Sequence, residues 1–505
     1  MISNQKKNFI AAFERGENFI PVYESWPADL ETPLTTWLKL AKGDKHGVFL
    51  ESVEGGENIG RWSIVAHDPL WEAFCVGEET TKISRDGCEI KEKGDVFNLL
   101  RDWTKVYKSH SLDEFPFVGQ LYGSWGYELI NCIEKSVPVH TLKSNEIANG
   151  SWMFFDQIVI FDQLKRCLTA LVYADLTKMQ GNSIEQIYND SIKKIDRIRQ
   201  SMQLPLKEID ILNWTQKKDF DLEIQSNWEK DDFEQAVTKA KEYIKNGDIF
   251  QIVISQKFNT KVTSQPFDLY RSLRMVNPSP YMAFFDFGSW YLIGSSPEVM
   301  VKAEKIKNNQ ILASLRPIAG TRPRGIDREE DVKLEKDLLS DPKEVSEHVM
   351  LVDLGRNDLG RVCQIGTVEV KDLMVIEKYS HVMHIVSQVQ GVLDKKKDVW
   401  DLLKASFPAG TVTGAPKVRA MQLINSFEKD ARGAYAGIYG SVDINGALNT
   451  AITIRSMIVV PSEGNTFEVS VQAGAGIVAD SSPKCEYQET INKAKGILTA
   501  ISSLE

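Results

Sequence analysis

The order of strand and helix patterns in the second half of the chain restricts its fold more than any other feature. Strand patterns fit residues 249–258, 280–287, 290–295, 380–392, 436–444, 449–460 and 467–478. Helical patterns fit residues 233–244, 266–275, 328–340, 342–353, 398–405, 416–428 and 483–501. Strands and helices do not alternate regularly, and no GxGxxG motif follows a first strand, so a Rossmann fold is not expected. The pattern predicts a large layered α+β protein.

Residues 204–228 form a polar connector between a helical pattern over residues 183–203 and the clearer patterns of the second half. Short strands and helices are mixed before this connector, and Val48–Val53 is one strand candidate. We therefore expect an N-terminal region over residues 1–205 and a second region over residues 229–505. The chain of 505 residues is long enough to bury a large core.

The net charge of −10 argues against a protein that binds nucleic acid or an anionic membrane. An anionic substrate would therefore need a local positive pocket. The six cysteines include no CxxC pair, which favours reduced thiols over disulfides or a zinc site. The sequence contains no secretory signal and no run of 18 apolar residues. These observations predict a cytoplasmic protein that is not bound to a membrane.

Two helix starts that lie far apart in the chain each carry a pair of carboxylates. Glu344 and Glu347 share one face of the first helix, and Glu486 and Glu489 share one face of the second, because residues i and i+3 are neighbours on a helix. If the two faces meet, four carboxylates converge, and Mg²⁺ is a cation that prefers such oxygen ligands. The alternative for the first pair is that Glu344 completes a capping box with Asp341.

Three other features of the second half are typical of anion-binding sites. The loop over residues 409–417 is rich in Gly and Thr and leads into a helix, where free N–H groups bind anions, but its glycine spacing is not that of a P-loop. Gly474 and Gly476 interrupt a strand, which indicates a bulge or a ligand close to the backbone. Arg455 lies among apolar neighbours and needs an anion, either a structural carboxylate or a substrate.

Glu298 and His384 are candidates for acid–base chemistry. Glu298 ends a strand where the chain turns, and burial would raise the pKa of such a carboxyl far enough for a general acid. His384 alternates with valines and faces the same side as they do, a position that also fits a histidine in the core. Lys493 lies one helical turn after Glu489, a spacing typical of an exposed ion pair on a helix.

Eight short strings, in their order along the chain, resemble motifs of the chorismate-utilising enzymes, and the anthranilate-forming branch is the nearest match. The strings are Leu50–Ser52, Asn277–Met282, Gly294–Glu298, Pro317–Thr321, Glu347–Leu354, Gly410–Lys417, Arg432–Gly437 and Gln472–Gly476. The resemblance covers nearly the whole chain. It implies an α+β fold, a complex α/β sandwich of two large antiparallel sheets flanked by helices, with the active site between the layers.

The resemblance implies a lyase that converts chorismate and ammonia into anthranilate and pyruvate, the first committed step of tryptophan biosynthesis. Glu298 would be the general acid for departure of the C4 hydroxyl, and His384 would help to orient it. Tyr435 and Arg455 would bind the enolpyruvyl carboxylate of chorismate. The full set of expected substrate-binding residues is Thr321, Thr411, Gly414, Tyr435, Arg455, Gly474, Ala475, Gly476 and Lys493.

Mg²⁺ is the cofactor that the resemblance implies. Glu347 and Glu489 would hold the ion, Glu344 and Glu486 would support it through water, and the ion would bind the ring carboxylate of chorismate. The resemblance also implies feedback inhibition by L-tryptophan. The residues expected at that separate site are Glu51, Ser52, Pro278, Ser279, Tyr281 and Met282.

Ala319 and Gln251 distinguish branches of the resembled family. A nucleophilic Lys is common at the position of Ala319 in the aminodeoxychorismate branch, and a Lys that activates water is common at the position of Gln251 in the isochorismate and salicylate branches. Both departures favour attack by ammonia. The alternatives are component I of aminodeoxychorismate synthase and a catalytically silent regulator that binds chorismate or tryptophan, although such a regulator is not expected to keep all four carboxylates.

A separate glutamine amidotransferase subunit is the partner that the resemblance implies, since none of the cysteines has the Gly-rich surroundings of a nucleophile of that class. The expected assembly is a heterotetramer of two synthase chains and two amidotransferase chains.

Overall fold

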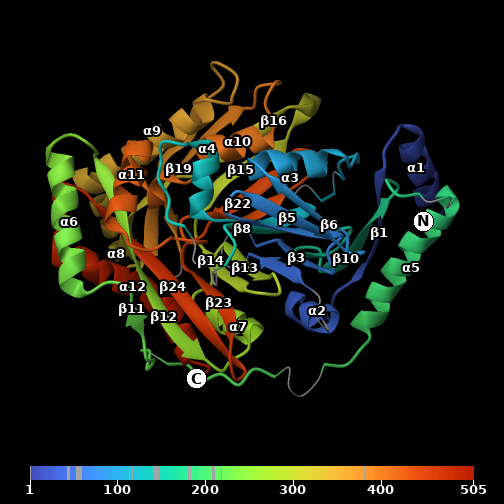
Figure 1. Ribbon diagram of the computed structural model, residues 1–505, viewed down its shortest axis with the longest axis horizontal. Helices are drawn as coiled ribbons and strands as arrows, with labels where there is room; N and C mark the ends of the chain where they lie inside the picture. The colour runs from blue at the N-terminus through green and yellow to red at the C-terminus, as the bar shows by residue number, and fades with distance from the viewer. Residues whose placement is uncertain are drawn as a thin grey trace.

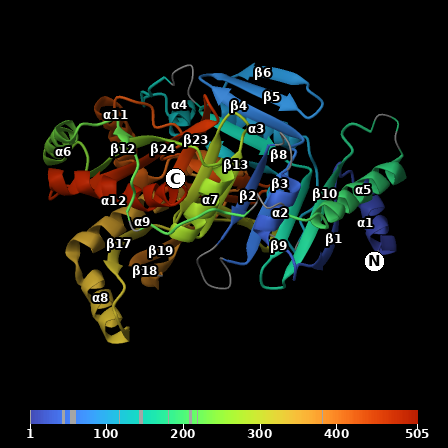
Figure 2. The ribbon, with the colours of Figure 1, turned by 90° about the horizontal axis from the view of Figure 1, so that it is seen from below.

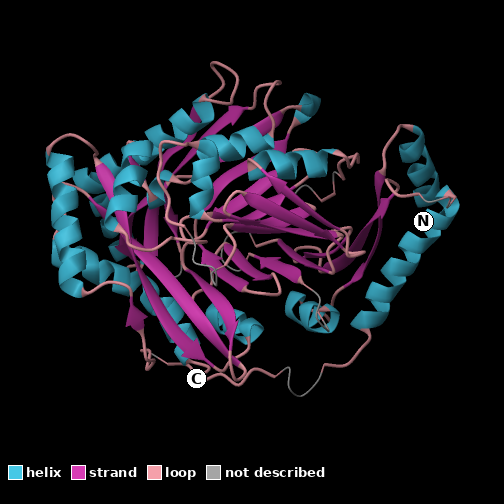
Figure 3. Ribbon diagram, in the orientation of Figure 1, coloured by secondary structure: helices cyan, strands magenta, loops and turns pink. Residues whose placement is uncertain are grey.

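The computed structural model describes residues 2–41, 46–52, 60–112, 114–115, 118–141, 147–179, 181, 183–206, 211–217, 219–379 and 382–505. Over these residues the strands form two twelve-stranded antiparallel sheets, which we name sheet A and sheet B (Figures 1 and 3). The predicted α+β class with two large antiparallel sheets is therefore confirmed.

Sheet A follows the order β1 (Phe19–Pro27), β10 (Cys167–Asp175), β9 (Gln157–Asp162), β3 (Trp62–His67), β2 (Gly47–Glu51), β13 (Tyr281–Asp286), β14 (Tyr291–Ser296), β23 (Ser456–Ser462), β24 (Thr466–Ile477), β12 (Gln251–Val262) and β11 (Gln225–Ser226), and β20 (Gly414–Ala415) also pairs with β12. Sheet B follows the order β17 (Ile318–Pro323), β19 (Val382–Val392), β16 (Ile311–Leu315), β15 (Val299–Lys305), β22 (Leu448–Ile452), β21 (Ile438–Val442), β7 (Leu121–Trp125), β8 (Gly150–Phe154), β4 (Trp71–Val76), β5 (Glu79–Ser84) and β6 (Glu89–Lys93), and β18 (Glu369–Lys378) also pairs with β19.

Both halves of the chain contribute strands to both sheets. β2 pairs with β13 in sheet A, and β7 pairs with β21 in sheet B. The division expected at residues 204–228 stays a prediction about folding units. What the structure adds is that strands on either side of this connector are joined by hydrogen bonds in each layer.

The apolar core has two main parts because successive residues of a strand face opposite sides of a sheet. Phe285 belongs to the part between the sheets, together with Trp125 and Trp152 of sheet B. Phe284 belongs to the part on the outer face of sheet A, where Trp37 packs edge-on against its ring. Alternate side chains of strand β13 therefore enter the two parts of the core.

Helices cover the outer face of sheet A and flank sheet B (Figure 2). The helices whose residues pack on the outer face of sheet A are α1 (Ile2–Glu14), α2 (Pro33–Leu40), α5 (Ile184–Met202), α7 (Pro266–Val276) and α12 (Pro483–Ser502). The remaining helices are α3 (Val96–Lys105), α4 (Ile130–Ile133), α6 (Lys230–Lys245), α8 (Arg328–Ser340), α9 (Pro342–Gly360), α10 (Val399–Ser406) and α11 (Lys417–Phe427), with short 3₁₀ turns η1 (Tyr127–Leu129), η3 (Lys307–Asn309) and η4 (Gly410–Val412). Among the described helices, none is both long and apolar enough to cross a membrane.

The strand predicted over residues 449–460 is wrong in one respect. The structure places β22 in sheet B and β23 in sheet A, and the chain crosses from one layer to the other between them. Arg455, at this crossover, has a φ of 48°, which a non-glycine residue adopts only when its surroundings require it. The pattern could not show the break because the residues on either side of it are equally apolar.

Other differences concern one helix end and four strands. Helix α9 continues to Gly360, beyond the predicted end at residue 353, and strands β15 to β18 were not predicted. Strand β2 ends at Glu51, and Val53 lies outside the described residues, as do residues 380 and 381 of the strand predicted over 380–392.

Candidate active site

A cavity of about 290 Å³ lies between the two sheets. Ten residues predicted for catalysis, substrate binding or the metal line it. They are Glu298, Thr321, Glu347, His384, Thr411, Tyr435, Arg455, Gly474, Gly476 and Lys493. These residues are scattered over almost 200 positions of the chain, and the fold brings them together.

Two crossovers between the sheets position the charged groups of the cavity. The chain passes from β14 of sheet A to β15 of sheet B at Glu298, and from β22 of sheet B to β23 of sheet A at Arg455. The two crossings are joined by backbone hydrogen bonds from Ser295 N to Arg455 O (3.1 Å) and from Ile452 N to Glu298 O (3.0 Å). A carboxyl and a guanidinium are thus fixed side by side between the layers.

Glu298 has the electrostatics of a general acid at neutral pH. Burial raises the pKa of its carboxyl to about 7, against the opposing effects of the Thr411 hydroxyl and of the Lys493 and Arg455 charges. A carboxyl with this pKa is partly protonated near pH 7 and can give up a proton there.

His384 is neutral and held in one orientation. Its Nδ1 lies 3.1 Å from Gly320 O, which can only accept, and 3.0 Å from Thr321 Oγ1. Nδ1 therefore carries the hydrogen, and Nε2 is left as an acceptor. Burial lowers the pKa of His384, and the Arg455 charge adds to this effect. The histidine is thus a wall of the cavity, on the strand β19 face predicted for it.

The glycines of strand β24 give the cavity a backbone floor. A Cβ on Gly474 would lie 2.5 Å from Tyr435 Oη, so only glycine lets this hydroxyl approach the strand. Lys493 Nζ donates to Gly474 O over 2.9 Å and pairs with Glu489 Oε1 at 2.7 Å. Lys493 therefore does more than form the exposed helix pair that its spacing suggested.

The two pairs of carboxylates lie near the starts of α9 and α12, as predicted, with Glu344 and Glu486 in the first turns. Burial raises the pKa of Glu486, the Glu489 charge adds to the rise, and the Lys343 charge from α9 opposes it. The helix starts are therefore close enough to interact. Glu486 Oε2 is buried without a hydrogen-bond partner among the described residues, and Gln251 Nε2 donates to Glu347 Oε1 over 3.1 Å.

The carboxylates do not form a closed ligand set. Among the described residues, no three His, Cys, Asp or Glu side chains lie together in the arrangement of a metal site. The capping-box alternative does not account for Glu344 either, because Asp341 caps α9 by accepting from Lys343 N, and Glu344 instead lies 3.9 Å from Arg322 Nη1.

Two predicted substrate-binding residues are placed differently. Of the described residues around the cavity, Gly414 and Ala475 are not part of the lining. Gly414 presses against strand β12, where a Cβ would lie 2.2 Å from Gln251 O, and Ala475 is fully buried on the opposite side of β24. In the loop predicted to bind an anion, Lys417 is engaged elsewhere, since its Nζ lies 2.8 Å from Asp358 Oδ2.

Several lining residues were not predicted. They include Val253, Ile318, Leu351, Tyr379 and Ile454. Two of them follow from periodicity: Leu351 lies one helical turn after Glu347, and Val253 lies on the same strand face as Gln251. Ala319 and Gln251, which the sequence singled out as branch markers, also line the cavity.

The two segments predicted for feedback meet at the β2–β13 pair. Glu51 lies opposite Met282 in the register, and Arg274 of α7 pairs with the buried Glu51 carboxylate. Ser52 Oγ is buried without a partner in the described part of the chain. Pro278 and Ser279, from the same predicted site, line the catalytic cavity itself, so the loop before β13 touches both places.

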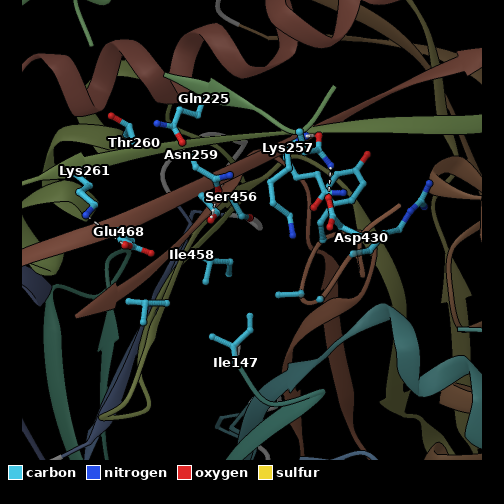
Figure 4. Close-up of a pocket in the computed structure, with 18 of the residues that line it drawn as sticks. Ile147, Gln225, Lys257, Asn259, Thr260, Lys261, Asp430, Ser456, Ile458 and Glu468 are labelled. Atoms are coloured by element: carbon cyan, nitrogen blue, oxygen red, sulfur yellow. Dashed lines mark hydrogen bonds and ion pairs between the residues drawn. The ribbon is translucent and has the colours of Figure 1, made fainter. Parts of the chain in front are cut away.

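A larger cleft of about 820 Å³ adjoins the cavity along the inner face of sheet A (Figure 4). Lys257, Asn259 and Lys261 of β12 line it, together with Asp430. Tyr435 and Gln472 line both the cleft and the cavity. These two side chains therefore form the partition between the two spaces.

The cavity between the two sheets holds a carboxyl with a near-neutral pKa, a neutral histidine and cationic groups. This combination is typical of an enzyme that acts on a small anionic substrate. Residues 61–499 match the family model described as chorismate binding enzyme. The chain belongs to this family of chorismate binding enzymes.

Individual relatives show which members of this family the chain is similar to. The chain is 49% identical over 509 residues to anthranilate synthase component 1 of Synechocystis sp., with full coverage of both chains. It is 43% identical to the protein of that name from Acetivibrio thermocellus, over 96% of this chain and 95% of the relative. The crystal structure of anthranilate synthase component I from Streptococcus pneumoniae superposes with a TM-score of 0.74 at 35% identity, covering 94% of this chain and 99% of the other.

Proposed function

We propose that this chain is the synthase component of a two-component enzyme and converts chorismate and ammonia into anthranilate and pyruvate. The observation that carries the proposal is the cavity, where Glu298 with a pKa of about 7 lies beside Arg455 and the glycine floor. The 49% identity over the full length to a protein named anthranilate synthase component 1 supports the same reaction.

The cavity fits a small dianion. Arg455 and the Tyr435 hydroxyl bind the enolpyruvyl carboxylate in this proposal. Lys493 and the backbone around Gly474 lie toward the α12 carboxylates and take the ring carboxylate. A local cationic rim of this kind overcomes the net charge of −10, which alone would repel such a substrate.

The reaction begins when ammonia attacks C2 of the ring and the C4 hydroxyl departs. Protonated Glu298 gives its proton to that oxygen, which leaves as water, and neutral His384 keeps the site oriented through its bonds to Gly320 and Thr321. The amine then returns one proton to the Glu298 carboxylate. In the second stage C2 loses its hydrogen as a proton and the bond between C3 and the enolpyruvyl oxygen breaks. The released enolpyruvate takes up a proton on its methylene carbon and becomes pyruvate, which leaves the aromatic product.

Ammonia is the nucleophile because the cavity offers no lysine at the two positions where the family uses one, namely Ala319 and Gln251. Gln251 Nε2 is bound to Glu347, while its Oε1 is buried without a partner among the described residues. This amide oxygen can accept a hydrogen bond from an incoming N–H group.

Mg²⁺ is the cofactor we propose. The chemistry of the donors fits it, since carboxylate oxygens at two neighbouring helix starts are the ligands that Mg²⁺ prefers, and the buried Glu486 Oε2 has no hydrogen-bond partner among the described residues. Glu347 and Glu489 would hold the ion, with Glu344 and Glu486 in support. Bound there, the ion supplies charge stabilisation and a template for the ring carboxylate.

The partner we propose is a glutamine amidotransferase subunit that supplies ammonia, within a heterotetramer of two chains of each kind. The cleft that ends at Tyr435 and Gln472 is a suitable entrance for the ammonia.

The inhibitor we propose is L-tryptophan, bound at the β2–β13 site. The Glu51–Arg274 pair at this site, and the loop that the site shares with the cavity, support this proposal.

The test is direct. The purified chain is incubated with chorismate, Mg²⁺ and an ammonium salt, and the fluorescence of anthranilate is followed. Formation of anthranilate and pyruvate in equal amounts is expected. If chorismate is consumed to give aminodeoxychorismate or isochorismate instead, the proposed reaction is wrong.

A further inference from the structure

Arg432 and Glu428 form an ion pair that is almost completely removed from solvent. The side chains are 1% and 5% exposed, and Arg432 Nη2 lies 2.7 Å from Glu428 Oε1 while Nε lies 2.8 Å from Oε2. The pair is not part of the cavity lining described above. Buried pairs of this type contribute little net stability, so their geometry is the more informative property.

The guanidinium joins three parts of the cavity wall. Its Nη1 donates to Val412 O in the turn that carries Thr411, and its Nη2 donates to Val253 O of strand β12, both over 2.8 Å. Its carbon lies 5.6 Å from the centroid of the Tyr435 ring. One planar group therefore sets the distance between the Thr411 turn, the strand and the Tyr435 ring.

Glu428 extends the same network to the partition with the cleft. Its Oε1 accepts from Ser255 N (2.8 Å) and Ser255 Oγ (2.9 Å), and Gln472 Nε2 donates to that Ser255 oxygen over 2.8 Å. Gln472 lines both the cavity and the cleft. The pair thus also fixes the side chain that separates the two spaces.

The backbone of the segment is held from the other half of the chain. Both carboxylate oxygens of Glu128, in η1, accept N–H groups, from Arg432 over 2.7 Å and from Gly433 over 3.0 Å. The neighbouring Tyr127 ring covers the guanidinium at 4.8 Å. Arg432 can therefore move only if several elements move with it.

We propose that Arg432 is a positioning residue, whose planar guanidinium aligns Tyr435, the Thr411 turn and Gln472 so that the dianionic substrate binds. The shape of the group matters as well as its charge, because an ammonium cannot direct four hydrogen bonds in one plane. This inference rests on the proposed function, since it concerns binding of the substrate proposed there.

The test compares Arg432→Lys with a control, Arg85→Lys, in which another arginine paired with a buried carboxylate is changed in the same way. Arg85, in the turn between β5 and β6, pairs with the buried Asp156 and donates to the carbonyl of Pro69, and it lines neither the cavity nor the cleft. Chorismate dissociation constants are measured by calorimetry on folded protein, with KM and kcat from anthranilate fluorescence. Arg432→Lys should weaken chorismate binding and raise KM by about 10- to 100-fold, the effect of misplacing one charge-assisted contact.

The control separates positioning from stability. Both variants should lower the melting temperature, but only Arg432→Lys should change chorismate binding. Unchanged binding by folded Arg432→Lys, or an equal loss in Arg85→Lys, overturns the inference. If Arg432→Lys does not fold, Glu428→Gln is used, which keeps an oxygen for Ser255 but removes the charge that orients the guanidinium. Wild-type protein that does not bind chorismate would instead refute the proposed function.

Discussion

Glu298 must hold a proton when the C4 hydroxyl of the substrate departs. Its carboxyl has a pKa raised to about 7 by burial, so kcat at a fixed concentration of free ammonia should be level below that pH and fall above it. Glu298→Gln should lower kcat by about 10²–10⁴-fold and remove this pH dependence. Initial rates of anthranilate formation across the pH range test both points. A variant with wild-type activity would assign the acid role to another group.

Glu298 should also make the free energy of unfolding depend on pH. The folded pKa of Glu298 lies above its ordinary value, so its contribution to the free energy of unfolding is fully present at acid pH and is lost as pH rises through about 7. Glu298→Gln should therefore melt at a higher temperature than the wild type above that pH, and the difference should shrink on acidification. Thermal unfolding at a series of pH values measures this.

Gly474 and Gly476 make a matched pair for a second test. A Cβ on Gly474 would meet Tyr435 Oη at 2.5 Å and Val253 Cγ1 at 2.7 Å, so Gly474→Ala must displace the tyrosine. A Cβ on Gly476 would meet only the end of the flexible Gln251 side chain, at 2.9 Å. Gly474→Ala should raise the KM for chorismate by about tenfold or more, the loss of one good hydrogen bond, and Gly476→Ala should raise it less. Equal effects would contradict the role given to Tyr435.

Among single residues, those whose type is unusual for their surroundings in the sequence could be predicted as site residues. His384 lies within an apolar strand, Glu298 and Arg455 lie at the ends of apolar strands, and all three line the cavity. Arg432 could not be assigned, because two of its partners are the backbone carbonyls of residues 253 and 412, which only the fold brings to it, and Glu428 lies just four residues before it.

At the scale of elements, helix starts were predictable and crossings between sheets were not. Pro342 and Pro483 mark the starts of α9 and α12 because proline is favoured at the first helical position. The crossing at Arg455 has no such mark, since its backbone conformation is imposed by the two sheets that it joins. The place of the site between layers was therefore implied by resemblance, and not by local pattern.

The carboxylates at the starts of α9 and α12 are the proposed ligands of Mg²⁺. Glu347→Gln and Glu489→Gln should each weaken Mg²⁺ binding by about tenfold or more, because each removes one charged oxygen ligand. Calorimetric titration with Mg²⁺ measures binding independently of activity, and circular dichroism checks the fold. Glu329→Gln, on the exposed first turn of α8, serves as the control. Unaltered Mg²⁺ affinity in both site variants would remove the ion from this place.

The β2–β13 pair carries the prediction for the inhibitor. Ser52 is partly buried at the end of β2, beside the ion pair of Glu51 and Arg274, so Ser52→Phe should fill the space for tryptophan. Loss of inhibition with normal uninhibited turnover is expected, as a coupling of about 1–3 kcal/mol would disappear. Inhibition curves for tryptophan at fixed chorismate measure this. An unchanged curve would mean that tryptophan acts elsewhere.

For the whole molecule, strands from both halves of the chain make both sheets, so the cavity, the cleft and the β2–β13 site proposed for tryptophan are parts of one framework. The sequence predicted the class of fold from irregular alternation of strands and helices. It could not predict the strand order, in which β2 pairs with β13 and β7 with β21 across more than 200 residues, because pairing of distant strands depends on the packed layers.

The last prediction concerns the source of ammonia. Near neutral pH most ammonia is protonated and cannot act as a nucleophile, so a chain that uses it needs a protected supply. The cleft of about 820 Å³ reaches the partition of Tyr435 and Gln472 from outside, and neutral polar groups such as Asn259 line it. The isolated chain should therefore make anthranilate from ammonium salts at raised pH but not from glutamine. Addition of a glutamine amidotransferase subunit should confer use of glutamine at neutral pH. Anthranilate formation from glutamine by the chain alone, after removal of free ammonia, would show that this chain needs no such partner.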